Sequence, residues 1–249
     1  MIIKHPTCDA VPCLKALWRE AFDDGDFSDV FFSTVFEPSH ALAAIIDGDI
    51  AGALYFLDCE YSGIPVAYVY AVATSKRYRG RGVCRALMEE CHRILKERGY
   101  GFVILKPGSD ELFSLYGKLG YMTCGYFCSV TADADGTADI REISKEEYSL
   151  LRQGSLPRNG VDVGDKFLEF AAEYMHFFAG DGYVFTAHTD DNELYCAELI
   201  GKEPTLSSVV GALGCRKGHF RLEGNEPFIM GHPLKCECPD DLRFTLTFD

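Results

Sequence analysis

The chain has 249 residues and a formal net charge of −14, from 24 lysines and arginines against 38 aspartates and glutamates. Its length suffices for one large or two small domains, and its 47% hydrophobic content is ordinary for a globular protein. Because nucleic-acid phosphates need a positive partner surface, this charge argues against nonspecific nucleic-acid binding. No apolar run reaches the roughly 18 residues of a membrane span, and the first residues lack the pattern of a secretory signal, so we expect a cytoplasmic protein that binds no membrane.

The first part of the chain predicts strands and helices in alternation. We expect a strand at 1–4 and an amphipathic helix from Asp9 to about Phe22. Two strands follow within 40–58, around the turn Asp47-Gly48-Asp49. The run 64–74 is apolar almost throughout, which predicts a strand buried on both faces.

A glycine-containing turn follows, and then a stripe of apolar residues that predicts a helix ending near Gly99. The first half closes with a strand at 101–107, a helix at 109–120 and a strand at 121–130. The stretch 131–139 is small, acidic and rich in turn residues, which is typical of a linker. The later pattern predicts a helix near 164–179, a hairpin turning at 190–192, a helix near 204–213, and strands near 218–223, 227–232 and 242–248. We therefore expect a first domain at 1–130, a linker at 131–140 and a second domain at 141–249.

The eleven cysteines are scattered and odd in number, which is typical of reduced thiols that pack as small hydrophobes. Cys236 and Cys238 are close in sequence, but only His232 lies near them, so we expect no metal site. The seven histidines show no spacing that indicates a site.

The segment SKRYRGRGVCRAL at 75–87 places five basic side chains around Gly80 and Gly82, between a strand and a helix. The glycines let successive N–H groups face one concavity, and the helix N-terminus adds free donors and a positive dipole end. Such a turn fits a polyanion such as a pyrophosphate. The pattern GxxxxGK[ST] is absent, and GxGxxG fails because Arg85 stands where the third glycine should be.

The text Arg77-Tyr78-Arg79-Gly80-Arg81-Gly82 fits [QR]-x-x-G-x-[GA], and LYGKLGY follows at 115–121. With the order of elements, these motifs resemble the GNAT N-acetyltransferase superfamily over about residues 1–130. The text LKPGSDELFSLYGKLGY is also similar to the enhanced intracellular survival group, whose members carry a second acetyltransferase-like domain. The resemblance implies an α/β (α+β) fold with a mixed central sheet flanked by helices, followed by a smaller, degenerate GNAT-like α/β domain.

The resemblance implies acetyl-CoA as co-substrate, and we expect no metal beside it. Its pantetheine arm would pair with the backbone of Val72, Ala73 and Thr74, where the strand splays from its neighbour at a bulge. Ser109 stands where many members carry Asn, which is a departure from the family pattern. The pyrophosphate would meet Arg77 and the amides of Arg79, Gly80, Arg81, Gly82, Val83 and Cys84. A helix N-terminus can lower a thiol pKa, but direct transfer needs no nucleophile, so we interpret Cys84 as structural.

The resemblance also implies direct transfer, in which a neutral amine attacks the thioester and CoA thiolate leaves. The Ala73 amide would stabilise the oxyanion. Tyr116 matches the family's tyrosine in LYxKxGF and is the candidate general acid; a phenol pKa of about 10 against a thiol near 8.5 makes it weak but usable if held close.

The general base is open. Many members carry a glutamate on the central strand, but residues 65–68 include no carboxylate. Tyr70 either orders a water in the cleft or packs, and Glu37 and Glu60 are unanchored alternatives. In the enhanced intracellular survival group the C-terminal carboxylate acts as base, and Asp249 would take that role here unless it is simply a solvated chain end.

We interpret the chain as an acetyl-CoA-dependent N-acetyltransferase (EC 2.3.1.-) acting on an amine of a small molecule or peptide. The negative charge favours a cationic acceptor such as an aminoglycoside, a polyamine or a peptide amine. The alternative is a non-catalytic acyl-CoA-binding or regulatory module, which the missing glutamate favours and Tyr116 disfavours. The second domain would wall the acceptor cleft, and a homodimer would be ordinary for this superfamily.

Overall fold

The computed structural model describes residues 1–23 and 25–248 and divides into two compact units. Unit 1 comprises Met1–Met122 and Met230–Cys238, and unit 2 comprises Thr123–Ile229 and Pro239–Asp249. These bounds differ from the expected segments 1–130, 131–140 and 141–249, because unit 1 takes back a segment from late in the chain. Residues 134–140 form a loop held within unit 2, where the Ala134 amide donates to the Arg216 carbonyl and the Asp135 amide to the Ser207 carbonyl.

Unit 1 begins with the expected strand and helix, and it adds a second helix and two 3-10 turns before the next strand. They are β1 (Ile2–Lys4), the 3-10 turn η1 (Cys8–Ala10), α1 (Val11–Phe22), α2 (Gly25–Thr34) and the 3-10 turn η2 (Pro38–His40). Asp23 adopts the left-handed conformation and its amide donates to the Arg19 carbonyl, which ends α1.

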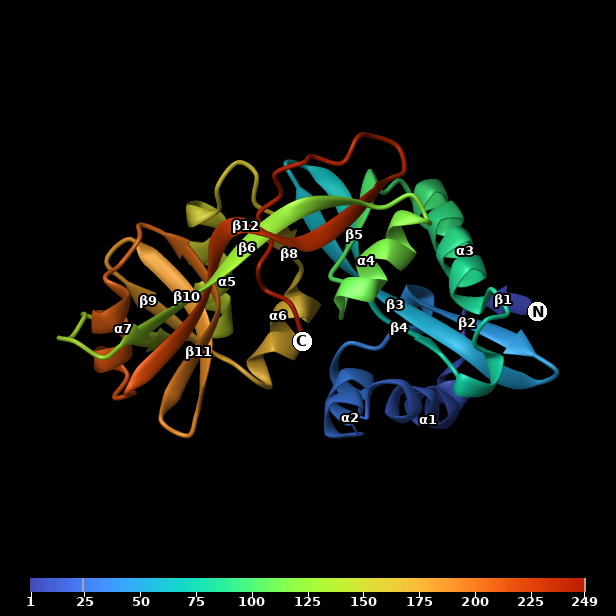
Figure 1. Cartoon of the computed structure of the whole chain (residues 1–249), viewed down its shortest axis with the longest axis horizontal. Helices are drawn as coiled ribbons and strands as arrows, with labels where there is room; N and C mark the ends of the chain where they lie inside the picture. The colour runs from blue at the N-terminus through green and yellow to red at the C-terminus, as the bar shows by residue number, and fades with distance from the viewer. Residues whose placement is uncertain (24, 249) are drawn as a thin grey trace. The chain divides into compact units, whose positions relative to one another are not determined.

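The sheet of unit 1 is mixed, as expected (Figure 1). Its order is β1, β2 (Ala41–Ile46), β3 (Asp49–Tyr61), β4 (Ile64–Thr74), β5 (Phe102–Leu105) and the last residues of β12 (Lys217–Pro233). β4 and β5 run parallel, and the other neighbours run antiparallel. The helix α3 (Val83–Arg98) makes the crossover from β4 to β5.

The two faces of this sheet carry different cores. Alternation along β3 turns Leu54 and Phe56 toward α3, where they join a cluster of mainly aliphatic residues. Tyr55 points to the other face, where its ring meets those of Trp18 and Phe31 from α1 and α2. Figure 1 shows α3 on one side of β2 to β4 and α1 with α2 on the other.

The end of β12 completes the sheet of unit 1 at its β5 edge. Residues 230–233 pair antiparallel with 105–102, and the amides of residues 234–236 all donate to the Gly101 carbonyl. A Cβ on Gly101 would lie 2.3 Å from Ile64 Cγ2 and 2.7 Å from Cys236 Sγ, so this approach requires glycine. The helix α4 (Asp110–Gly117) and the strand β6 (Met122–Asp133) follow β5 in the chain.

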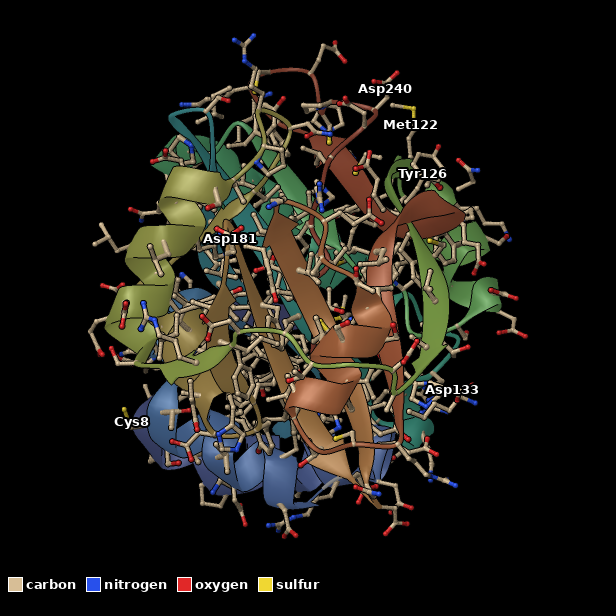
Figure 2. All side chains as sticks on the ribbon, turned by 90° about the vertical axis from the view of Figure 1, so that its left-hand side faces the viewer. Cys8, Met122, Tyr126, Asp133, Asp181 and Asp240 are labelled. Atoms are coloured by element: carbon tan, nitrogen blue, oxygen red, sulfur yellow. The ribbon has the colours of Figure 1, made fainter. Side chains whose placement is uncertain are left out.

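Unit 2 is a second mixed sheet with helices. Its elements besides β6 and β12 are β7 (Arg141–Ile143), α5 (Lys145–Ser155), β8 (Asp162–Val163), α6 (Asp165–Ala172), β9 (His176–Gly180), β10 (Tyr183–Asp190), β11 (Glu193–Gly201) and α7 (Leu206–Ala212). The strand order is β6, β12, β11, β10, β9, β7, and β11 runs parallel to β12 across the α7 crossover. On β6, Tyr126 and Asp133 project outward and are exposed (Figure 2).

A buried ion cluster joins three elements of unit 2, namely α5, β8 and β11. Arg152 on α5 donates to both carboxylate oxygens of Glu198 on β11, at 2.8 and 3.1 Å, and also to Asp162 at 2.8 Å. The Tyr148 hydroxyl donates to Glu198 at 2.7 Å, and the Val161 carbonyl accepts from Arg152 at 2.9 Å. Arg152 and Glu198 are only 1% and 2% exposed, so the pair depends on these hydrogen bonds for its stability.

Several expectations for the second half are wrong. The helix near 164–179 ends at Ala172, because His176–Gly180 pair with β10 and alternate between buried and less buried. Phe177 and Phe178 therefore lie on a strand and not on the helix of Phe167 and Phe170. The strands near 218–223 and 227–232 are one continuous strand, and 242–248 contributes only isolated bridges at Leu242 and Arg243.

The helix α5 was not predicted, although its start signal is present. The Ser144 hydroxyl accepts from the Glu147 amide at 3.2 Å, which is half of a capping box.

Among the described residues, no helix combines the length and apolar character that a membrane crossing requires.

Candidate functional site

The glycine turn between β4 and α3 has the expected backbone shape. A 3-10 turn, η3 (Lys76–Tyr78), leads into Gly80 and Gly82, which have φ of 73° and 76°. A Cβ on either glycine would meet no atom within 4 Å, so the space beside both is open. The turn thus presents bare backbone to an incoming ligand.

The turn and the start of α3 also offer free backbone donors. In the described part of the chain, the amides of residues 79–85 donate to no backbone carbonyl, and the first helical bond runs from Ala86 to Gly82. No side chain caps the helix at its N-cap, Gly82. The donors and the positive end of the helix dipole together suit an anion.

The basic side chains of the turn differ in their engagement. Arg77 pairs with Asp49 at 3.1 Å, and the Tyr78 hydroxyl donates to the same Asp49 oxygen at 2.8 Å. Arg79 donates from Nε to the Thr74 carbonyl at 3.3 Å, and Arg81 lies over the Tyr78 ring. Asp49 thus fixes the turn through Arg77 and Tyr78, while the guanidiniums of Arg79 and Arg81 pair with no carboxylate among the described residues.

The strand β4 splays from β5 just before the turn. Their pairing runs from Val66↔Phe102 to Tyr68↔Ile104 and goes no further along β4. On the other side, the register with β3 shifts between Ala53↔Ala73 and Tyr55↔Tyr70, and Ala71 has a positive φ of 49°. The expected bulge is therefore present, at Ala71 and Val72.

The hydrogen bonds between β3 and β4 show which backbone groups of β4 face its open edge. The Ser75 amide donates to the Ala51 carbonyl, and Ala73 lies opposite Ala53 two residues on. Because hydrogen-bonded pairs alternate in antiparallel strands, the Ala73 amide faces β3 while those of Val72 and Thr74 face away from it. The Val72 amide is therefore the donor at the bulge that faces the open edge of β4. The sequence analysis had suggested the Ala73 amide for that role.

Gly52 on β3 lets α3 start close to the sheet. A Cβ there would lie 2.7 Å from Val83 Cγ1 and 2.8 Å from the Ala73 carbonyl oxygen. Gly52 was not identified from the sequence, and Asp49 was identified only as part of the turn at 47–49. A glycine inside a strand often marks a place where another part of the backbone approaches closely. This signal could have identified Gly52 from the sequence.

Tyr116 lies near the start of α3, close to Cys84. It is 7% exposed and belongs to the core cluster against which Cys84 packs. Burial, and then the nearby Cys84, raises the pKa of the Tyr116 phenol above its ordinary value, so the phenol stays protonated at neutral pH. Burial also raises the pKa of the Cys84 thiol, against the lowering that a helix N-terminus favours, which agrees with a structural role.

Tyr70 lies on the opposite face of the sheet from the cluster of Tyr116. Its ring contacts those of Trp18, Phe31 and Tyr68 at centroid distances of 5.8 to 6.0 Å. The structure therefore places Tyr70 in an aromatic core and does not bring it to Tyr116.

The remaining candidate bases have other contacts. Glu60 accepts from the Gly63 amide in the β3–β4 turn at 3.2 Å, and Glu37 pairs with His40 at 3.1 Å. Asp249 lies outside the described residues. Ser109 occupies the N-cap of α4, where its side chain hydrogen-bonds Glu111 and lowers the pKa of that carboxyl.

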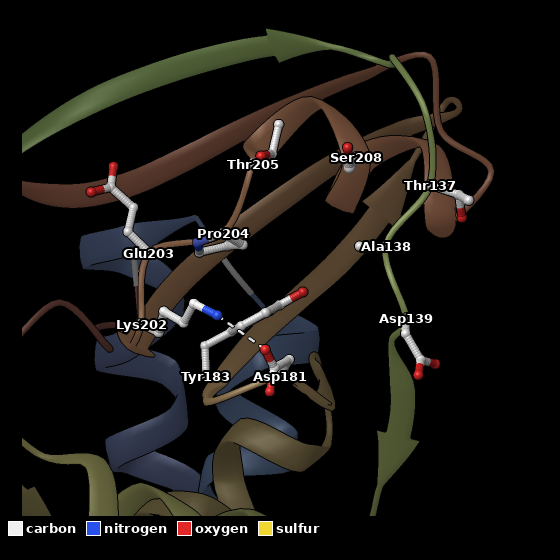
Figure 3. Close-up of a pocket in the computed structure, with 10 residues that line it drawn as sticks. All are labelled: Thr137, Ala138, Asp139, Asp181, Tyr183, Lys202, Glu203, Pro204, Thr205 and Ser208. Atoms are coloured by element: carbon white, nitrogen blue, oxygen red, sulfur yellow. Dashed lines mark hydrogen bonds and ion pairs between the residues drawn. The ribbon is translucent and has the colours of Figure 1, made fainter.

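Unit 2 has a separate open depression of about 340 Å³, drawn in Figure 3. It is lined by the loops at 137–139 and 202–205, with Tyr183 and an exposed Lys202–Asp181 ion pair of 3.0 Å. None of the site residues expected from the sequence lines it.

Within the described residues, no group of three or more His, Cys, Asp or Glu side chains is arranged to hold a metal ion.

Residues 3–124 match the family model described as the acetyltransferase (GNAT) domain. No curated protein matches the sequence. The fold is similar to that of a GCN5-related N-acetyltransferase from Kribbella flavida, with 16% identity and a TM-score of 0.72 over 94% of this chain and 71% of that one. It is also similar to a GCN5-related N-acetyltransferase from Anabaena variabilis, with 14% identity and a TM-score of 0.74 over 92% of this chain and 72% of that one. A third similar structure, Eis1 from Mycobacterium abscessus, has 11% identity and a TM-score of 0.68 over 94% of this chain and 74% of that one.

Proposed function

Because residues 3–124 belong to the GNAT acetyltransferase family, we propose that this chain transfers the acetyl group of acetyl-CoA to an amine of a small molecule or peptide. The family supports acyl transfer from an acyl-CoA in general. The observation that carries the finer proposal is the junction of β4 with the turn, where an open strand edge runs into a row of free amides. All the residues involved belong to unit 1, so unit 1 is the proposed catalytic unit.

The residues present fit acetyl-CoA along this junction. The outward groups of Val72 and Thr74 would pair with the pantetheine arm, which contains amides and can add to a strand edge. The amides of residues 79–85 would hold the pyrophosphate, with Arg79 and Arg81 supplying positive charge. The open space beside Gly80 and Gly82 would admit the phosphates to the backbone.

Transfer would proceed by attack of a neutral amine on the thioester carbonyl. The Val72 amide, which faces the open edge at the bulge, would donate to the oxyanion that forms. The C–S bond then breaks, and Tyr116 would give its phenolic proton to the leaving thiolate. The acceptor is proposed to be cationic, since the chain carries a charge of −14.

A non-catalytic acyl-CoA-binding module is the second candidate. It is favoured by the engagement of Glu37 and Glu60 in other contacts, which leaves no glutamate assigned as base. It shares the cofactor site and differs in having no turnover.

Calorimetric titration of acetyl-CoA tests the shared site. We expect saturable binding to the unaltered chain and its loss in Gly82→Trp, which fills the open space and strains a residue at φ 76°. Pro204→Trp, in the corresponding crossover of unit 2, is the matched control and should bind normally. Failure of the unaltered chain to bind would exclude both candidates.

Release of CoA separates the two candidates, measured chromatographically with a polyamine, an aminoglycoside and a peptide amine. Turnover with at least one amine, reduced at least a hundredfold in Tyr116→Phe with unchanged acetyl-CoA affinity, would support the enzyme. An unchanged rate in Tyr116→Phe would remove the general acid, and saturable binding with no turnover on any amine would favour the binding module.

A further inference from the structure

Two stacked histidines contact the turn at residues 117–121, which follows Tyr116. His92 comes from α3 and His232 from the end of β12, and their rings stack with centroids 4.1 Å apart and planes 11° apart. Both belong to unit 1, although 140 positions separate them in the chain. No feature of the sequence had indicated a role for either residue.

His232 contacts the backbone of that turn directly. Its Nδ1 donates to the Gly120 carbonyl at 3.1 Å. A Cβ on Gly120 would lie 3.2 Å from the imidazole ring, and Gly120 has a φ of 85°, so only glycine fits beneath His232 without strain. The same turn holds Tyr116, because the amides of Leu119 and Tyr121 both donate to the Tyr116 carbonyl, at 2.9 and 3.1 Å.

His92 holds the next residue of the turn. Its Nε2 lies 2.8 Å from the Tyr121 hydroxyl, and Tyr121 is 3% exposed. Burial, and then the charge of His232, lowers the pKa of His92 to about 3, so His92 is neutral and its Nε2 accepts from the hydroxyl. The Tyr121 ring in turn packs edge-on against the Tyr116 ring, with centroids 5.7 Å apart and planes 61° apart.

We propose that the His92–His232 pair positions Tyr116 for proton donation by holding Gly120 and Tyr121. The two histidines are positioning residues and touch no substrate. This inference rests on the proposed function, in which Tyr116 is the general acid. It assigns to the segment 230–238 a part in catalysis as well as in completing the sheet.

The physical reason is that proton donation depends on a short, aligned hydrogen bond to the leaving sulfur. Burial raises the pKa of the Tyr116 phenol, which makes it a weak acid. A weak acid donates efficiently only when its hydroxyl is held close to the leaving sulfur, so a small displacement of the ring should slow the reaction. Loss of the His232 contact frees the Gly120 carbonyl and lets the Tyr116 ring move by fractions of an ångström. The effect should fall on turnover and leave acetyl-CoA binding intact, because the turn amides and the β4 edge are elsewhere in the unit.

The experiment measures kcat, the KM for acetyl-CoA and thermal unfolding for His232 variants of the full chain, with the best amine of the panel above. In His232→Ala we expect kcat to fall about tenfold to a hundredfold with KM changed less than twofold. His232→Asn keeps the donor to Gly120 and His232→Phe keeps the stack, so each should recover part of the rate. His219→Ala is the matched control, since His219 stacks on Tyr195 in unit 2 at 4.8 Å and should leave kcat unchanged.

A double-mutant cycle with Tyr116→Phe separates positioning from general support of the fold. If the histidines act through Tyr116, His232→Ala should cost no further rate once Tyr116 is Phe. An equal loss in both backgrounds, or an unchanged kcat in His232→Ala, would overturn the proposal. If His232→Ala does not fold, the same cycle with His232→Phe decides.

Failure of the proposed function gives a different result. An unchanged rate in Tyr116→Phe removes the general acid and the positioning role together. If Tyr116→Phe lowers kcat strongly and the His232 variants lower kcat by the same factor in both backgrounds, Tyr116 remains the general acid and only the positioning role is excluded.

Discussion

Units 1 and 2 each contain a crossover in which a helix links two parallel strands, and the two crossovers differ at the turn. In unit 1 the path is β4, the turn at 75–82, α3 and β5; in unit 2 it is β11, the turn at 202–205, α7 and β12. The topology is the same in outline. The proposed anion site of unit 1 therefore depends on the turn and not on the crossover.

The turn of unit 2 lacks several of the features that suit a phosphate in unit 1. Pro204 has no N–H, Glu203 adds negative charge, and α7 has 7 residues where α3 has 16. The depression at this turn is lined by Asp139, Asp181 and Glu203 against Lys202, and Figure 3 shows the Glu203 and Asp139 side chains extending outward from it.

The units also differ in how they are completed. Unit 1 depends on residues 230–238 to cover the edge of β5, whereas the buried Arg152–Glu198 cluster links three elements of unit 2 internally. Four changes test these differences.

Truncation after residue 130 should abolish the cooperative folding of unit 1. It removes the antiparallel partner of β5, three amides that donate to Gly101, and Met230 from the core. The exposed β5 edge would favour aggregation. Thermal unfolding by circular dichroism and size-exclusion chromatography measure this, with residues 228–238 rejoined through a glycine-serine linker as the control. A sharp transition at the temperature of the full chain would show that 1–130 is autonomous.

Arg152→Met should destabilise unit 2 by about 3 to 5 kcal/mol, because it leaves the Glu198 carboxylate buried without its partner. Urea unfolding measures the loss. The combined change of Arg152→Met with Glu198→Met and Tyr148→Phe removes the stranded charge and should recover much of it. A loss below about 1 kcal/mol in the single variant would mean that water reaches the carboxylate.

Acidification should weaken the fold through His92. Its pKa falls from 6.5 to about 3 on folding, so between these values the unfolded state binds a proton that the folded state does not. Stability is therefore lost as the pH falls, by about 2 kcal/mol from pH 7 to pH 5. Urea midpoints at both pH values measure this, and His92→Phe should show a correspondingly smaller difference. Equal pH dependence in both proteins would contradict it.

Charge reversal at the two turns should act on only one of them. Arg81→Glu should weaken acetyl-CoA binding about tenfold, or about 1.4 kcal/mol, and less at high salt. Lys202→Glu, at the turn of unit 2, makes the same change in net charge and should leave the affinity unaltered. Equal weakening in both variants would indicate that the field of the whole chain, rather than the glycine turn, attracts the ligand.

Local signals in the sequence determined most of the frame of unit 1. The helix of residues 83–98 follows from its apolar stripe and Gly99, and the open turn follows from Gly80 and Gly82, because period and backbone freedom are properties of short segments. The GNAT motifs carried the identification of residues 3–124 in the same way.

Tertiary structure decided what depends on partners distant in the chain. Residues 176–180 carry an aromatic pattern that suits a helix or a strand, and pairing with β10 selected the strand. The return of Met230–Cys238 to unit 1, and with it the stack of His232 on His92, joins segments that share no local pattern. A contact of this kind is stabilised only when both segments are folded, so no window of sequence contains it.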